Sequence, residues 1–135
     1  MGNNICSCTT KFLEKRPETK EQKEKRLKKT YGNIPLQEVV IYKVMPTLGL
    51  AIEGGINSSQ MFPRVFAIQP NGSTFYSKTD LKVGNILLEV NGTCLVGLQH
   101  SEVAANIANA FLDESQDYLT FLVTEDGWQP KTSSI

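Results

Sequence analysis

From residue 36 the chain contains short segments rich in β-branched and apolar residues, and residues 37–44 mostly alternate with the two-residue period of a strand that has one buried face. Turn residues separate these segments, among them Pro70-Asn71-Gly72 and Asn91-Gly92. In the segment ILLEV we expect Ile86, Leu88 and Val90 to share the buried face. The pattern predicts five strands, over residues 37–44, 50–53, 65–68, 86–90 and 117–124.

Two segments of this region have a helical rather than a β period. Val103 and Ile107 recur at helical spacing within residues 100–111, which predicts an amphipathic helix, and residues 73–77 could form one helical turn. Gln99 offers a poor N-cap side chain, so we expect a weak start to the long helix. Short strands with one long helix and one short one predict a mainly β domain of the α+β class. An open sheet edge beside a helix is a natural site for strand addition by a peptide.

The segment PTLGLAIEGG places three glycines around an apolar alternation of Leu48, Leu50 and Ile52. Glycine weakens a strand, so its use here indicates a tight bend or a close approach to the backbone. Gly54 and Gly55 are expected to end the strand and to release a mobile loop from Ile56 to Phe62. The spacing of Gly49 and Gly54 fits a phosphate-binding loop, but the Lys and the Ser or Thr that such a loop requires are both missing.

Charge divides the chain into a basic arm and an acidic body. Residues 1–33 contain nine Lys and Arg and four Glu, a net charge of +5, and the remainder contains five basic and ten acidic residues, a net charge of −5. We expect residues 1–35 to be a disordered or partly helical arm, residues 36–125 a folded domain, and residues 126–135 a flexible tail. The arm suits an anionic membrane surface. It lacks interleaved aromatic residues, and the acidic body opposes nucleic acid, so no nucleic-acid partner is expected.

The chain begins MGNNICSC, which predicts a lipid anchor. Gly2 meets the requirement for N-myristoylation, although Cys6 stands where the usual pattern has Ser or Thr. Cys6 and Cys8 lie where palmitoylated cysteines occur in dually acylated proteins. A single myristoyl chain binds a bilayer marginally, and a second chain or a basic cluster stabilises the anchor. We therefore expect a cytoplasmic protein attached to the inner face of a membrane.

Three segments of the body together resemble a PDZ domain: LGLAI, FPRVFAIQPNGS and LKVGNILLEVNGTCLVGLQHSEVAANI. The resemblance covers about 90 residues in the family's element order. It implies a partly open antiparallel barrel or sandwich of five to six strands with one long groove helix and one short helix. It also implies a non-catalytic scaffold or adaptor that binds the C-terminal tails of membrane or signalling proteins.

The resemblance assigns the residues of a peptide groove. A carboxylate is held well by converging backbone N–H groups, and a glycine at position 49 allows the tight turn that convergence needs. The implied carboxylate-binding residues are Leu48, Gly49 and Leu50, with Lys43 supporting the charge. Other residues are expected to contact ligand side chains. They are Ile52, Ala104 and Ile107 in the pocket for the last residue, His100 for a Ser or Thr two residues earlier, and Ala51 and Phe66 further upstream.

Other functions are less well supported by the residues present. His100 is the only histidine, and no nucleophile, base and orienting group can be assembled around it, so an enzyme is not expected. No cofactor or metal site is predicted.

The chain ends in Ser133-Ser134-Ile135, which itself matches -(S/T)-x-Φ-COOH, where Φ is an apolar residue. An alternative function is therefore homotypic assembly, in which Ile135 occupies the groove of a neighbouring copy.

Overall fold

The structure is a computed structural model of the 135-residue chain, and it describes residues 19–125. The chain divides into two compact units, and each is described by itself. The first contains residues 1–35 and 129–135, and the second contains residues 36–128. In the first unit the described part consists of residues 19–35. Within residues 19–125 no helix combines the length and the apolar character needed to cross a bilayer.

The helix of the first unit is α1, Lys20–Tyr31. Thr19 Oγ1 accepts from the backbone N–H of Gln22 at 3.1 Å, and Gln22 Oε1 accepts from the N–H of Thr19 at 3.0 Å. This reciprocal pair is a capping box, which satisfies two N–H groups that a helix start leaves open. Sequence alone leaves a fraying helix and disorder open for this segment. The structure shows a helix of three turns with a capped start.

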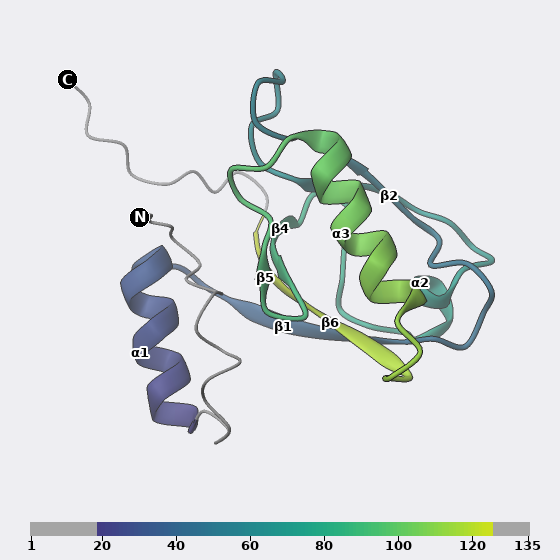
Figure 1. Ribbon diagram of the computed structural model, residues 1–135, viewed down its shortest axis with the longest axis horizontal. Helices are drawn as coiled ribbons and strands as arrows, with labels where there is room; N and C mark the ends of the chain where they lie inside the picture. The colour runs from purple at the N-terminus through teal and green to yellow at the C-terminus, as the bar shows by residue number, and fades with distance from the viewer. Residues whose placement is uncertain (1–18, 126–135) are drawn as a thin grey trace. The chain divides into compact units, whose positions relative to one another are not determined.

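The body is built on one antiparallel sheet (Figure 1). Five strands follow the spatial order β1-β6-β4-β3-β2, and the short β5 pairs with β4. The predicted fold class, a mainly β domain of five to six strands, is confirmed. The strands are β1 Gln37–Tyr42, β2 Leu50–Glu53, β3 Arg64–Ile68, β4 Ile86–Val90, β5 Thr93–Cys94 and β6 Tyr118–Thr124.

Two helices complete the body, α2 at Ser73–Tyr76 and α3 at His100–Leu112. The start of α3 is better capped than Gln99 alone predicts, because the Glu102 carboxylate accepts from the backbone N–H of Gln99 at 2.9 Å. A carboxylate in the first turn also interacts favourably with the positive end of the helix dipole. The prediction of a weak helix start considered Gln99 alone, whereas Glu102, a residue inside the helix, supplies a cap through its carboxylate.

The hydrophobic core lies between the sheet and α3. Phe121 and Leu119 of β6 are fully buried, as are Ile41 of β1 and Val103 of α3, and all four belong to one cluster. The burial predicted for Ile86, Leu88 and Val90 of β4 is confirmed, but Leu87 and Glu89 are buried as well, so burial is not confined to one face. Leu87 rather than Leu88 belongs to the core cluster. The register between β4 and β6 shifts between Leu87 and Glu89, and such a bulge interrupts the two-residue period on which the prediction rests.

Candidate functional site

Strand β2 lies at one end of the sheet order and is paired on one side only. Its partner is β3, with Leu50 opposite Ile68 and Ala51 opposite Ala67. The other edge carries no strand among the described residues. An unpaired edge presents backbone N–H and C=O groups to whatever extended chain can reach it. This edge is therefore where the sheet could accept an additional strand.

A cavity of about 320 Å³ lies between the start of β2 and the side of α3. That volume is at the lower end of the range for ligand pockets, about 300–1,000 Å³. Five of the residues predicted for the groove line it together, although their role in binding stays a prediction. Sequence reasoning missed Ala108 and Phe111, which continue the helical spacing from Ala104 and Ile107. The full lining is Pro46, Thr47, Leu48, Leu50, Ile52, Ala104, Ile107, Ala108, Phe111 and Leu112.

The loop that precedes β2 turns three successive carbonyl groups to one side. The carbonyl of Thr47 accepts from Ser73 N at 2.8 Å, that of Leu48 from Thr74 N at 3.0 Å, and that of Gly49 from Gln69 N at 2.9 Å. The C=O and the following N–H of a planar trans peptide point in opposite directions, and residues 19–125 contain no cis peptide. The N–H groups of Leu48 and Gly49 therefore point away from α2, and that of Leu50 points away from Gln69.

Gly49 is required by a close approach between two stretches of backbone. Its φ is +71°, a conformation that favours glycine, and a Cβ built on it would lie 2.6 Å from the Cα of Gly72. A Cβ on Gly72 would in turn lie 2.3 Å from the Cα of Gly49. From sequence we expected the glycine to allow a tight turn, and the structure adds that it lets α2 approach the loop. This approach allows Ser73 and Thr74 to reach the carbonyl groups of the loop.

Lys43 contacts the C-terminal end of α3. Its Nζ donates to the backbone carbonyl of Asp113, the residue after the helix, at 2.6 Å. The pKa of Asp113 is lowered chiefly because the N–H of Ser115 donates to its carboxylate at 2.9 Å, with a smaller contribution from the charge of Lys43. The structure thus gives Lys43 a role in fixing the end of α3. Its support of a bound carboxylate stays a prediction.

His100 is the first residue of α3 and is exposed. Its Nδ1 lies 2.9 Å from the carbonyl oxygen of Gly54, the residue that follows β2. The predicted contact of this ring with a ligand is not tested by the structure. The ring lies near the end of β2, whereas the loop of residues 47–49 lies at its start. A ligand that runs antiparallel to β2 would therefore place residues upstream of its C-terminus near the ring.

Ala51 and Phe66 are the two residues predicted to face upstream ligand positions. Ala51 is half-buried and lies on the open-edged strand β2. Phe66 is the extra residue where the β2–β3 register shifts between Ala51 and Ile52, and 61% of it is exposed. A bulge redirects the side chain of its extra residue. Sequence alone cannot place such a bulge, because residues 65–68 are all apolar and nothing distinguishes Phe66 from its neighbours.

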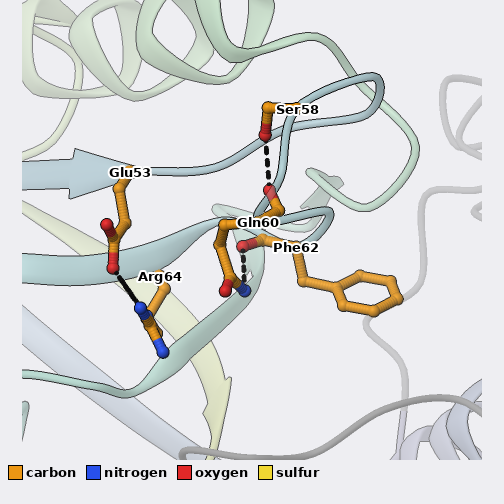
Figure 2. A network of polar contacts seen from close by, with 5 residues as sticks. All are labelled: Glu53, Ser58, Gln60, Phe62 and Arg64. Carbon is orange, nitrogen blue, oxygen red and sulfur yellow. Dashed lines mark hydrogen bonds and ion pairs between the residues drawn. The ribbon is translucent and has the colours of Figure 1, made fainter.

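The loop from Gly54 to Pro63 is held by hydrogen bonds, which the sequence-based expectation of a mobile loop did not include. Figure 2 shows the Ser58 hydroxyl donating to the Gln60 carbonyl at 2.7 Å and Gln60 Nε2 donating to the Phe62 carbonyl at 3.0 Å. The backbone N–H of Ile56 also donates to the Leu98 carbonyl at 2.8 Å. This loop is therefore tied both to itself and to the segment before α3.

The remaining predicted site residues lie outside the described part of the chain. Gly2, Cys6 and Cys8, the expected lipidation sites, and Ile135, the expected self-ligand, fall within residues 1–18 and 126–135. Across residues 19–125 no group of His, Cys, Asp and Glu side chains is arranged to hold a metal ion. In the same range every buried side-chain nitrogen or oxygen has a hydrogen-bond partner.

Comparison with known proteins gives relatives that are much longer than this chain. Whirlin of Mus musculus is 41% identical over 125 residues, which is 92% of this chain but 14% of whirlin. Whirlin of Homo sapiens is 49% identical over 87 residues, or 64% of this chain and 10% of whirlin. The chain therefore spans about a tenth to a seventh of the length of these relatives. No family model matches the sequence.

Solved structures share the fold of the body. The second PDZ domain of Dlg1 from the choanoflagellate Monosiga brevicollis has a TM-score of 0.56 at 18% identity, and covers 68% of this chain and 100% of that one. The PDZ domain of choanoflagellate GIPC, solved with a GAIP peptide, has a TM-score of 0.54 at 25% identity, and covers 75% and 97%. Residues 36–125 therefore have the fold of a PDZ domain.

Proposed function

Because residues 36–125 have the PDZ fold, we propose that they form a non-catalytic adaptor domain that binds the C-terminal tails of partner proteins. The ligand adds a strand to the open edge of β2 and ends in the sequence -(S/T)-x-Φ-COOH. Its last side chain fills the apolar cavity between β2 and α3. Partners of this kind include membrane and signalling proteins with free cytoplasmic C-termini.

The observation that carries this proposal is the position of the apolar cavity at the start of an unpaired strand edge. Leu48 and Leu50 line the cavity, and their N–H groups point away from Ser73 and Gln69, which bind the preceding carbonyls. A terminal residue offers both an apolar side chain and a carboxylate, and the two must be bound within a few ångströms of each other. Adjacent apolar lining and backbone donors meet that need.

The position of His100 favours a ligand with a Ser or Thr two residues before its C-terminus. The ligand runs antiparallel to β2, so its earlier residues lie toward the end of that strand, where Gly54 contacts the His100 ring. An imidazole nitrogen can form a hydrogen bond with a Ser or Thr hydroxyl. The His100→Ala variant should bind a peptide with Thr at this position about two- to twelvefold more weakly, the value of one net hydrogen bond. Equal binding by the variant would remove this role.

A related structure provides independent support for the ligand class. The GIPC domain was solved with a peptide bound to it, and its fold matches this chain over 75% of the sequence. That finding concerns GIPC alone. It makes a peptide the first ligand to test on this chain.

The experiment is a binding measurement with paired synthetic peptides that differ only at the C-terminus. One ends in -Thr-x-Ile with a free carboxylate and the other is amidated. The free acid should bind at least tenfold more tightly, because amidation removes the anion that the Leu48–Leu50 N–H groups would hold. Equal affinity for the two peptides, or binding of neither across a free-carboxylate library, would contradict the proposal.

Two further predictions concern segments outside the described residues. Acylation at Gly2, Cys6 and Cys8 would attach the adaptor to the inner membrane leaflet together with the basic arm, and labelling with a myristate analogue in wild type and Gly2→Ala tests it. Homotypic binding through Ile135 is the alternative function. Sedimentation of the chain with and without Ile135 tests it, and an unchanged distribution would exclude it.

A further inference from the structure

The hydrogen bond from Lys43 to the residue after α3 joins the two walls of the apolar cavity at one end. On one wall lie Pro46 and Thr47, three and four residues after Lys43. On the other wall lies Leu112, directly before Asp113, whose carbonyl oxygen accepts from Lys43 Nζ at 2.6 Å. A side chain attached to one wall therefore holds the end of the other. We call this bond the clasp.

The wall from which Lys43 extends is itself bonded to neighbouring elements. The Ser73 hydroxyl of α2 accepts from the Met45 N–H at 2.9 Å and donates to the Met45 carbonyl at 3.1 Å. The Ser73 N–H donates to the Thr47 carbonyl at 2.8 Å. The backbone N–H of Lys43 donates to the carbonyl of Asp117, the residue before β6, also at 2.8 Å. This segment is thus a fixed base from which the clasp can hold α3.

The end of α3 depends on a contact from outside the helix. Its last turn, which lies wholly within the described residues, contains no basic residue, and neither Asp113 nor Glu114 is the glycine that commonly ends a helix. The last carbonyls of a helix have no partner within it and carry partial negative charge. Through the clasp Lys43 supplies both a donor and a positive charge at this point.

Of the two residues that end α3, packing fixes one more firmly than the other. Phe111 is half-buried and packs against the core cluster, whereas Leu112 is 70% exposed, although both line the cavity. The clasp bonds the residue that directly follows Leu112, so it restrains the backbone that carries this side chain. An apolar ligand residue in the cavity would cover Leu112. The apolar contact that the ligand gains there therefore depends on the clasp.

We propose that Lys43 is a positioning residue, which through the clasp holds Leu112 against the cavity and so sets how strongly the groove distinguishes a large from a small apolar residue at the ligand's C-terminus. This inference rests on the proposed function. It differs from the carboxylate support that the PDZ resemblance implies for Lys43, in which the ammonium acts on the charge of the ligand. The two roles predict losses in two different ratios of affinity.

The experiment uses peptides that end in -Thr-x-Ile or -Thr-x-Ala, each as free acid and as amide. Wild type should bind the Ile acid at least about tenfold more tightly than the Ala acid, because Ile buries more apolar surface. Met has nearly the length of Lys and cannot donate. In Lys43→Met the Ile-to-Ala ratio should therefore fall by about two- to twelvefold, the value of one net hydrogen bond. The acid-to-amide ratio should stay within twofold of wild type.

Two further variants of basic residues serve as controls. Lys43→Arg still carries a charged donor and should keep both ratios close to those of wild type. Lys82→Met removes a cation at an exposed position that does not line the cavity, so it should also leave both ratios unchanged. Together they separate loss of the clasp from a general loss of positive charge.

A double-mutant cycle tests whether Lys43 acts through Leu112. Leu112→Ala removes the side chain that the clasp holds, so it should lower the Ile-to-Ala ratio by itself. Adding Lys43→Met to Leu112→Ala should then lower the ratio no further, because residues that act through one contact are not additive. Fully additive effects would show that Lys43 does not act through Leu112.

The outcomes separate this inference from the proposed function. An unchanged Ile-to-Ala ratio in Lys43→Met would overturn the positioning role, and a fall confined to the acid-to-amide ratio would assign Lys43 to the carboxylate instead. If wild type does not distinguish acid from amide, the proposed function itself fails. Should Lys43→Met not fold, Leu112→Ala at its exposed position still decides, since an unchanged Ile-to-Ala ratio in that variant would also overturn the inference.

Discussion

The two edges of the sheet, β1 and β2, differ in how their outward backbone groups are used. At the end of β1 the hydroxyl of Ser77 accepts from the Tyr42 N–H at 2.9 Å and lies 3.2 Å from the Tyr42 carbonyl oxygen. Ser73 does the same for Met45, with distances of 2.9 and 3.1 Å. Ser73 is the first residue of α2 and Ser77 directly follows it, so this short helix covers one end of the β1 edge. Strand β2 has no such cover among the described residues.

This difference shows that an open edge alone does not define a binding site. Both strands are terminal in the sheet and would expose a ladder of unpaired groups. At β1, side-chain hydroxyls take up the outward groups where the strand ends. Beside β2 lie an apolar cavity and a loop whose three N–H groups point away from residues 69–74. An extended peptide gains backbone pairing and apolar burial together only at β2.

The largest expected effect is on the cavity itself. Ala104 is exposed on α3 and lines the cavity, whereas its neighbour Ala105 is also exposed and does not. Ala104→Glu should weaken peptide binding about a hundredfold, or about 2.7 kcal/mol, because it fills an apolar site and adds a charge that repels the ligand carboxylate. Ala105→Glu should change affinity less than twofold. Equal effects of the two variants, measured by titration calorimetry, would place the binding site elsewhere.

A second variant tests the loop that begins the β2 edge. Gly72→Ala places a Cβ 2.3 Å from the Cα of Gly49, so the loop must shift away from α2. We expect about 1–3 kcal/mol of destabilisation in a denaturant titration, the usual cost of overpacking, and about tenfold weaker binding of a free-carboxylate peptide.

Gly92→Ala controls for glycine replacement at a turn, since its φ is +82° and no atom lies within 4 Å of the added Cβ. Gly92→Ala should lose stability, because a residue with a side chain is strained at that φ, but should bind the peptide normally. If Gly72→Ala also binds normally, the orientation of the loop N–H groups does not determine affinity.

The β1 edge is tested by removing its cover. Ser77→Ala deletes the hydroxyl that bonds to both backbone groups of Tyr42, at a half-buried position. The unfolding free energy should fall by about 0.5–1.5 kcal/mol, and the amide of Tyr42 should exchange its hydrogen faster. Peptide affinity should stay within twofold of wild type. A peptide that gained affinity for this variant would show that β1 is a second addition site held closed by Ser77.

Sequence patterns were sufficient to predict most of the fold. The alternation of apolar residues predicted β2 at Leu50–Glu53 and β4 at Ile86–Val90 with the bounds that the structure shows. Of the cavity lining, Leu48, Leu50 and Ile52 belong to the alternation along β2, whereas Ala104 and Ile107 were implied by the resemblance to PDZ domains. These features depend on residues close in sequence, so their spacing is visible without a structure.

The features that were missed depend on contacts between distant segments. The bulge at Leu88 changes which side chains of β4 face the core, and nothing in ILLEV marks it. Gly49 and Gly72 meet through the fold, as do His100 and Gly54, which are 46 residues apart. The glycines of PTLGLAIEGG thus signalled close approaches, but the backbone that approaches each of them is known only from the structure.

The smallest expected effect concerns the end of β2 on its paired side. Glu53 lies opposite Arg64 of β3, and Arg64 Nε donates to the Glu53 carboxylate at 2.7 Å (Figure 2). The two side chains are about one-third exposed, at 33% and 32%, so water screens the pair. In a double-mutant cycle with Glu53→Gln and Arg64→Gln, we expect a coupling of about 0–1 kcal/mol in unfolding free energy that shrinks at high salt.

The same cycle distinguishes the two sides of β2. The ion pair joins β2 to β3, whereas the proposed ligand would pair with the opposite edge, so each single variant should keep peptide affinity within twofold. A loss of more than fivefold in both variants would show that the open edge depends on how firmly the strand is held to its neighbour. Strand addition at β2 would then require the last pair of the β2–β3 ladder as well as the cavity.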